Sequence, residues 1–221
     1  MKKLVIFDVC NTIVDTNSTF SYVDFLINKW VKPWYKTLFH NRLLWYLYIL
    51  LYSLFKFNFK IFLIKKYFKW LDVNKIKSLS WEYFERYNSR IFPNILKIIN
   101  HEKKLSKVIL LSSSINPPID FLKEKFWIEW FSSTLEEKDG KYTWRVLQSL
   151  WWKKELLFKE WKINLDKYKK IELYTDNLDD VWLIKFLNAY WDFFVYIIIH
   201  HNRKYWNKFF SINNINHEFI G

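Results

Sequence analysis

The segment KLVIFD at residues 3–8 decides how the rest of the chain is interpreted. It is a short apolar run that ends in an acid, which predicts a buried strand with Asp8 at its carboxyl end. Three later segments have a similar apolar character: VILLSSS at 108–114, KIELYTD at 170–176 and FFVYIII at 193–199. Helical patterns separate these predicted strands, and such alternation is typical of a parallel sheet.

Residues 18–92 interrupt this alternation because they contain helical patterns alone. Within the interval, residues 36–55 and 57–70 are strongly apolar. We therefore predict an α/β protein with a Rossmann-like parallel sheet core, formed by residues 1–17 and 93–221. An all-helical cap domain, formed by residues 18–92, would be inserted into this core.

The composition excludes several classes of protein. The 221 residues are 51% hydrophobic and 26% charged, which is not the composition of a disordered chain. A single cysteine, Cys10, excludes a disulfide framework and a zinc site built from cysteines. The first residues lead directly into the first predicted strand without the pattern of a secretory signal, so we expect a cytoplasmic protein.

The net charge of +13 comes mostly from lysine, in a chain that is also rich in Ile, Asn, Phe and Tyr. AT-rich codons produce this bias without selection for binding. No recognised nucleic-acid-binding motif accompanies the charge. We therefore expect no nucleic-acid partner.

Polar side chains stand at the ends of the predicted strands. Asp8, Ser112 and Asp176 end three of them, and Asp180 lies in the first turn of the helix that follows Asp176. In an open α/β sheet, ligands bind at the carboxyl ends of the strands. Convergent carboxylates without a fixed counter-ion favour a hard divalent cation such as Mg2+, which can bridge a phosphate. Any one acid at a strand end is weak evidence, and Asp8 alone is equally consistent with a helix cap, so the prediction rests on the ordered set.

The segment FDVCNTIVD at 7–15 resembles the first motif of the haloacid dehalogenase superfamily of phosphohydrolases. The helical insertion directly after it is similar to the phosphoserine phosphatase-like branch of that superfamily. Three further segments resemble the second, third and fourth motifs in the same order: SSS at 112–114, Lys153-Lys154 and TDNLDD at 175–180.

The resemblance implies a phosphohydrolase in which Asp8 is the nucleophile and forms an aspartyl-phosphate. Thr12 and Ser112 would donate hydrogen bonds to the phosphoryl oxygens. Lys153 would hold Asp8 and the phosphate together by its charge. Lys154 is the alternative, because the spacing does not fix the register of this motif.

The resemblance also implies a Mg2+ ion as cofactor. Asp8, the backbone carbonyl of Cys10 and Asp176 would bind it, and Asp180 would support its water shell or the lysine. The remaining substrate-binding candidates of the second and fourth motifs are Ser113 and Asn177.

Cys10 departs from the family pattern, in which phosphatases carry a second aspartate two residues after the nucleophile as general acid and base. Such help typically contributes about 10²–10⁴-fold to the rate. A thiol with a pKa of about 8.5 can protonate a leaving alkoxide but is a poor base for the attacking water. Two functions therefore stay open: a Mg2+-dependent phosphatase for a small or lipid-linked phosphate monoester, and a catalytically weak protein of the same fold that binds a phosphoester or a membrane surface.

The apolar run Leu43–Phe55 bears on that choice. It has 13 uncharged residues, whereas a membrane span needs about 20. One interpretation is a helical hairpin whose apolar faces pack on each other over the active site. The other is an interfacial hairpin whose following lysines face anionic headgroups, which would place the protein at the inner face of the membrane. The lysines that follow the run are at positions 56, 60, 65, 66 and 69.

Glycine and tryptophan have unusual counts. The chain contains 2 glycines and 14 tryptophans, whereas average usage of about 7% would give roughly 15 glycines. Trp127, Trp161 and Trp191 each follow a helical pattern, where a left-handed residue, usually glycine, ends a helix. Either the protein has unusual aromatic turns, or these positions are glycine in the native protein, encoded by UGA codons that some bacteria read as glycine.

Overall fold

The computed structural model describes residues 2–40, 46, 59–87, 90–151, 153–160, 163–189, 192–198 and 203–220. Most of the apolar run Leu43–Phe55 lies outside these residues, as do Trp161 and Trp191. Among the helices that are described, none is long and apolar enough to cross a membrane.

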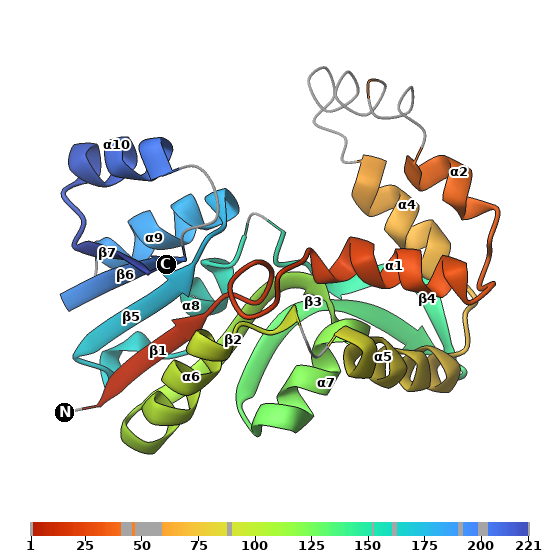
Figure 1. Cartoon of the computed structure of the whole chain (residues 1–221), viewed down its shortest axis with the longest axis horizontal. Helices are drawn as coiled ribbons and strands as arrows, with labels where there is room; N and C mark the ends of the chain where they lie inside the picture. The colour runs from red at the N-terminus through yellow and green to blue at the C-terminus, as the bar shows by residue number, and fades with distance from the viewer. Residues whose placement is uncertain are drawn as a thin grey trace.

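A seven-stranded sheet forms the centre of the fold, in the order β4-β3-β2-β1-β5-β6-β7 (Figure 1). All neighbouring strands pair in parallel except β3 and β4, which form an antiparallel hairpin. This arrangement confirms the predicted α/β fold with its mostly parallel sheet. The strands are β1 (Lys3–Phe7), β2 (Lys107–Ile115), β3 (Glu129–Lys138), β4 (Lys141–Gln148), β5 (Lys170–Thr175), β6 (Asp192–Ile198) and β7 (His217–Ile220).

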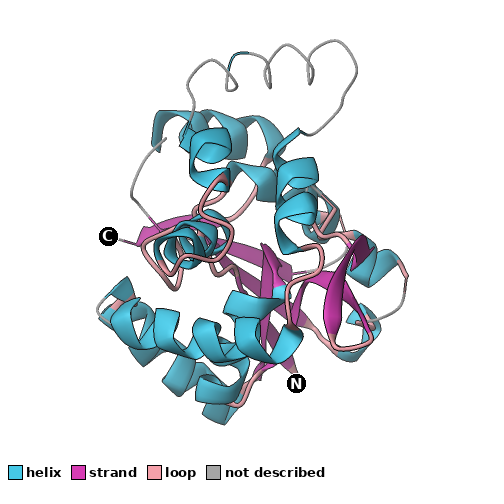
Figure 2. Cartoon of the chain, turned by 90° about the vertical axis from the view of Figure 1, so that its right-hand side faces the viewer, coloured by secondary structure: helices cyan, strands magenta, loops and turns pink. Residues whose placement is uncertain are grey.

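Helices lie on both sides of the sheet (Figure 2). The described α-helices after residue 92 are α6 (Pro93–Leu105), α7 (Asn116–Phe126), α8 (Leu156–Lys159), α9 (Val181–Asn188) and α10 (Arg203–Asn213). The described α-helices before residue 88 are α1 (Ser18–Asn28), α2 (Tyr35–His40), α4 (Phe59–Phe68) and α5 (Val73–Tyr87), and they gather at one end of the molecule.

Strand β1 is buried on both faces, which explains its uninterrupted apolar sequence. Val5 and Phe7 pack in one hydrophobic cluster with residues of α1, α5, α6 and α7. Leu4 and Ile6 pack in the other cluster, which includes residues of α9 and α10. Burial of β1 from both sides fixes the position of Asp8, the next residue along the chain.

The helices at residues 18–87 are joined to the β3–β4 hairpin by packing and by hydrogen bonds. Tyr142 of β4 lies edge-on to Phe68 of α4, with ring centroids 5.9 Å apart. Its backbone N–H donates to the carbonyl of Leu71, and its carbonyl accepts from the N–H of Trp70. Helix α5 also contacts α7. The division into a core at 1–17 and 93–221 and a cap at 18–92 stays a proposal, and these contacts describe how the two parts would be attached.

Candidate active site

Asp8 directly follows the central strand β1 and is buried. Its backbone N–H donates to the carbonyl of Tyr174 on the adjacent strand β5, at 2.9 Å. After Asp8 the chain forms a tight loop in which the N–H groups of Ile13 and Val14 donate to the carbonyl of Val9. This loop begins at the carboxyl end of the strand, where ligands bind in such sheets.

Lys154 is the cation that the structure places beside Asp8. Its buried Nζ lies 2.7 Å from Oδ1 of Asp8 and 2.7 Å from Oδ1 of Asp180. The hydroxyl of Thr175 donates to the other oxygen of Asp180, at 2.7 Å. One ammonium group therefore bridges two carboxylates that lie far apart in the sequence.

This arrangement corrects the choice of Lys153, whose side chain is exposed. The reason is the turn that leads into α8. The N–H of Lys153 donates to the carbonyl of Leu150, and the N–H of Leu157 donates to the carbonyl of Lys154. Lys154 and Leu157 thus face the interior together, three residues apart, and Lys153 points outward.

The carboxylates outnumber the ammonium group, and their pKa values reflect this. Burial raises the pKa of Asp8 to about 7, with Lys154 opposing the shift and Asp180 adding to it. Burial, together with the charges of Asp8 and Asp180, raises the pKa of Asp176 to about 8. Burial alone would lower the pKa of Lys154, but the two aspartates raise it above its usual range. The site therefore has an excess of negative charge that a further cation would relieve.

The donor set fits a Mg2+ ion, although it is sparse. The buried Oδ2 of Asp8 and Oδ1 of Asp176 have no hydrogen-bond partner among the described residues. Within the same part of the chain, no group of three or more His, Cys, Asp or Glu side chains is arranged to hold a metal by itself. Mg2+ does not require such a group, because it is usually bound by one or two carboxylates together with waters and substrate phosphate.

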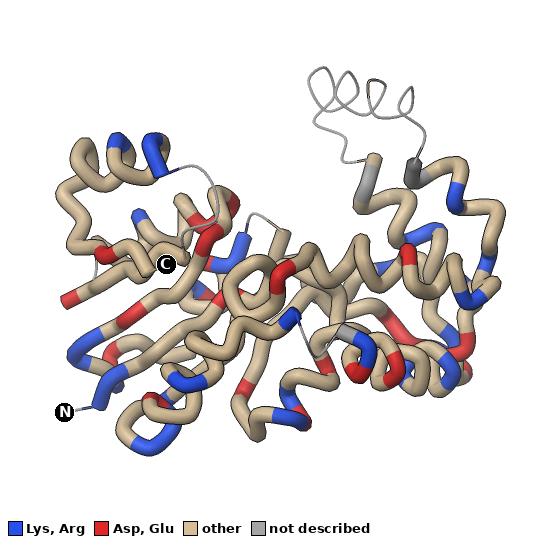
Figure 3. The backbone as a smooth tube through the Cα atoms, viewed as in Figure 1, with Lys and Arg blue, Asp and Glu red and all other residues tan. Residues whose placement is uncertain are grey.

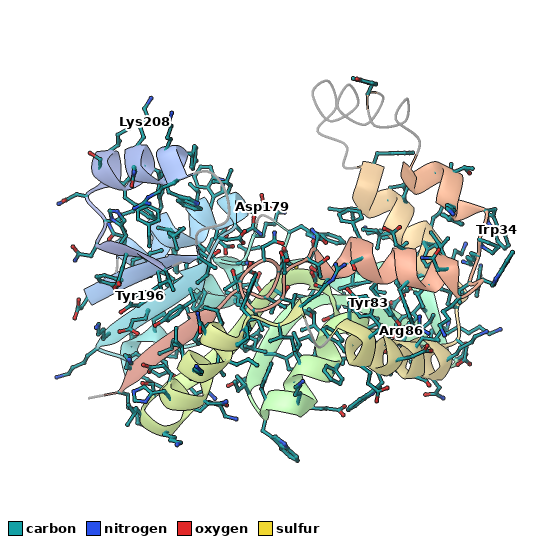
Figure 4. All side chains as sticks on the ribbon, in the orientation of Figure 1. Trp34, Tyr83, Arg86, Asp179, Tyr196 and Lys208 are labelled. Carbon is teal, nitrogen blue, oxygen red and sulfur yellow. The ribbon has the colours of Figure 1, made fainter. Side chains whose placement is uncertain are left out.

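The other predicted residues lie at the same edge of the sheet. Thr12 is buried, and its hydroxyl accepts a hydrogen bond from the N–H of Asp176, at 3.1 Å. The hydroxyl of Ser112 accepts from the N–H of Ser114, also at 3.1 Å. The side chain of Asn177 accepts from the N–H of Asp179 and so caps the turn after β5. Asp179 lies midway along the molecule, near the loop that follows β1 (Figure 4).

Ser113 contacts the neighbouring strand through its backbone carbonyl. Its side chain is half-buried, and its backbone carbonyl accepts a hydrogen bond from the hydroxyl of Ser133, at 2.8 Å. This bond joins the end of β2 to β3.

The thiol of Cys10 lies in a closed group of hydroxyls. Its Sγ is 3.1 Å from Oγ of Ser18 and 3.0 Å from Oγ of Ser114, and the two hydroxyls are 2.8 Å apart. The N–H of Ser18 also donates to the sulfur, at 3.4 Å. Burial raises the pKa of this thiol, and the charge of Asp8 raises it further. Sequence reasoning missed Ser18 and Ser114, although Ser114 is the last serine of the SSS motif.

Comparisons with known proteins identify the fold. No family model and no curated protein matches the chain. A protein of unknown function from Bordetella pertussis Tohama I has a similar structure, with a TM-score of 0.75 and 12% identity over 98% of both chains. A phospho-aspartyl intermediate analogue of phosphoserine phosphatase gives a TM-score of 0.52 and 20% identity, covering 89% of this chain and 86% of that one.

A haloacid dehalogenase-family hydrolase from Salmonella enterica serovar Typhi gives a TM-score of 0.61 and 14% identity, covering 99% of this chain and 66% of that one. The predicted resemblance to haloacid dehalogenase-type and phosphoserine phosphatase-like structures is thus confirmed at the level of the fold.

The two adjacent lysines provide a direct test of this geometry. We expect Lys154→Met to lower the free energy of unfolding by about 3–5 kcal/mol, because it leaves Asp8 and Asp180 buried without their partner. Lys153→Met should change it by no more than about 0.5 kcal/mol, because that side chain is exposed. Urea unfolding of both variants at neutral pH measures the difference. Equal losses for the two variants would contradict the assignment.

Proposed function

We propose that this protein is a Mg2+-dependent phosphomonoester hydrolase with Asp8 as its nucleophile. The observation that carries the proposal is the buried Asp8 at the end of the central strand, paired with Lys154 and next to Asp176 and Asp180. The phosphoserine phosphatase structures that share the fold support the same class of reaction. The substrate would be a small or lipid-linked phosphate monoester.

The reaction has two steps. A carboxylate oxygen of Asp8 attacks phosphorus, the bond between phosphorus and the ester oxygen breaks, and the leaving alkoxide takes up a proton. A water molecule then attacks the aspartyl-phosphate, loses a proton, and releases inorganic phosphate and the free carboxylate. Splitting one displacement into two lowers the barrier of each.

The chain's own residues hold the reacting groups. The charge of Lys154 opposes the effect of burial on Asp8 and so favours its ionised, nucleophilic form. Thr12 and Ser112 would donate their hydroxyl hydrogens to phosphoryl oxygens. Asp8, the carbonyl of Cys10 and Asp176 would hold the Mg2+ ion. When bound, this ion would offset the negative charge of the phosphoryl group.

Cys10 suits the first step better than the second. A neutral thiol with a raised pKa can donate its proton to the leaving alkoxide. It cannot readily accept the proton of the attacking water, and the hydroxyls of Ser18 and Ser114 beside it are weak bases as well. Hydrolysis of the aspartyl-phosphate would therefore be the slow step of turnover.

Release of phosphate from an aryl phosphate, such as p-nitrophenyl phosphate, tests the proposed activity. We expect turnover with Mg2+, its loss in EDTA, and its loss in Asp8→Asn, because an amide is not a nucleophile here. The matched control is Asp166→Asn, an exposed aspartate in the short helical turn at 165–167. It should retain full activity. Failure of a panel of phosphate esters to give metal-dependent turnover would overturn the proposal.

A second experiment tests the role of Cys10. We expect Cys10→Asp to speed hydrolysis of the aspartyl-phosphate by about 10²-fold, because an ionised carboxylate can take the water's proton. The N–H and hydroxyl of Ser18 and the hydroxyl of Ser114 contact the side chain at position 10 and could donate to the new carboxylate. Rapid-quench kinetics should show a burst of alcohol release in the wild type and no burst in this variant.

Cys10→Ser is the control for the size of the side chain, because it adds no base. It should keep the burst. If Cys10→Asp folds and turns over no faster than Cys10→Ser, the missing base does not limit the reaction.

We propose a second property of the same protein, namely that the end formed by α2 and α4 docks onto an anionic lipid surface. Residues 18–72 carry nine Lys and Arg residues against two acidic ones, which is about half of the chain's net positive charge. Lysines also stand along the described helices of this end (Figure 3). Leu38 and Phe62 are partly exposed there, beside the exposed Lys36 and Lys66. Basic and apolar side chains together favour a membrane interface.

Co-sedimentation with vesicles tests this docking. We expect binding to phosphatidylglycerol-containing vesicles that weakens with salt, and none to pure phosphatidylcholine. Lys36→Glu with Lys66→Glu should reduce binding at least several-fold. The matched control is Lys204→Glu with Lys208→Glu, which changes the charge by the same amount. These lysines lie on α10, at the opposite end of the molecule from Trp34 (Figure 4), so this pair should leave binding intact. Equal effects of the two pairs would contradict a specific docking end.

A further inference from the structure

Three tryptophans have a left-handed backbone conformation. Trp30 has φ 61°, Trp70 has φ 68° and Trp127 has φ 53°. A residue with a Cβ atom is strained in this region, and glycine is not. Each of the three stands at the end of a helix, where a left-handed glycine commonly ends the helix.

Trp30 occupies the glycine position of a complete Schellman motif at the end of α1. Its N–H donates to the carbonyl of Ile27, and the N–H of Val31 donates to the carbonyl of Leu26. Val31 and Leu26 are both buried, as the apolar contact of this motif requires. The hydrogen bonds and the apolar contact of the motif are therefore present, but tryptophan stands where the motif usually has glycine.

Trp127 and Trp70 repeat the pattern at the ends of α7 and α4. The N–H of Trp127 donates to the carbonyl of Lys123, which is the single bond of a left-handed helix cap. Trp70 lies two residues after Phe68, the last residue of α4, and its N–H donates to the carbonyl of Tyr142. At the end of α7 the bond that stops the helix therefore belongs to the backbone, whereas at the end of α4 the ammonium group of Lys32 donates to the carbonyls of Tyr67 and Lys69.

The three indole rings add almost no packing. Trp30 is 82% exposed, Trp70 68% and Trp127 90%. Tryptophan is on average a highly buried residue, because its large apolar surface is costly to leave in water. The rings follow three different helices, and most of each indole is exposed to solvent.

Most of the other described residues with positive φ are of types that tolerate this region, namely Asn11, Asp139, Gly140 and Asn214. The exception is Lys32, whose Cβ atom is strained there as well. Tryptophan is thus the residue type that recurs out of place.

We infer that positions 30, 70 and 127 are glycine in the native protein, encoded by UGA codons that its ribosomes read as glycine. Replacing these three tryptophans by glycine moves the counts of 2 glycines and 14 tryptophans toward ordinary usage. It also bears on the proposed lipid docking, because Trp30 and Trp70 lie at the ends of α1 and α4. With glycine there, the lysines and aliphatic side chains of that end would act without these two indoles.

Peptide mass spectrometry of the protein purified from its own organism tests this inference directly. Peptides that cover positions 30, 70 and 127 should have the mass of the glycine form, and the gene should carry TGA at each position. Tryptophan-containing peptides at these positions, or TGG codons, would overturn it.

A recombinant comparison tests the physical basis separately. The triple variant Trp30→Gly, Trp70→Gly, Trp127→Gly should unfold at higher urea than the tryptophan form. The matching triple alanine variant removes the same indoles but keeps a Cβ atom, so it should unfold at lower urea than the glycine form. A glycine variant no more stable than the alanine variant would contradict the role assigned to the left-handed backbone.

Discussion

At the carboxyl end of β1, the ammonium group of Lys154 lies 2.7 Å from an oxygen of Asp8 and 2.7 Å from an oxygen of Asp180. Burying three charges is costly unless they compensate one another, and here one cation faces two anions with Asp176 nearby. The pKa values of Asp8 and Asp176 rise accordingly, to about 7 and about 8. The proposed binding of Mg2+ and of a phosphoryl group rests on this excess of negative charge.

The parallel sheet makes this meeting of charges possible. Strands β2 and β5 flank β1 in parallel, so residues more than a hundred positions apart reach one edge. The thiol of Cys10 belongs to the same edge, but its partners are the hydroxyls of Ser18 and Ser114. In place of a carboxylate, the chain has a buried neutral group at this position. In the proposed reaction, this difference would favour formation of the phosphoenzyme over its hydrolysis.

Much of the fold was predictable from the sequence, because β1 and β5 are buried on both faces and an acid directly follows each. Strand β1 is apolar after Lys3, and in β5 the buried Glu172 is the charged residue within the run. The identity of the inward-facing lysine was not predictable from the sequence. Lys153 and Lys154 are chemically identical, and only the turn into α8 decides which one faces inward. The contacts of Cys10 with Ser18 and Ser114 depend on tertiary packing that no local pattern records. The attachment of α4 to the β3–β4 hairpin through Tyr142 also depends on tertiary packing. By contrast, the sequence pattern alone predicts a left-handed helix end at position 127, and the structure confirms it.

The central claim is that Asp8 carries the phosphoryl group, and chemical trapping tests it most directly. The full-length protein would be incubated with a phosphate monoester and Mg2+, quenched in acid, reduced with borohydride and digested for peptide mass spectrometry. Borohydride converts an acyl phosphate to an alcohol, so Asp8 should be recovered as homoserine, and only when substrate is present. Unmodified Asp8 together with substrate-dependent reduction at another carboxylate, or at none, would contradict the account.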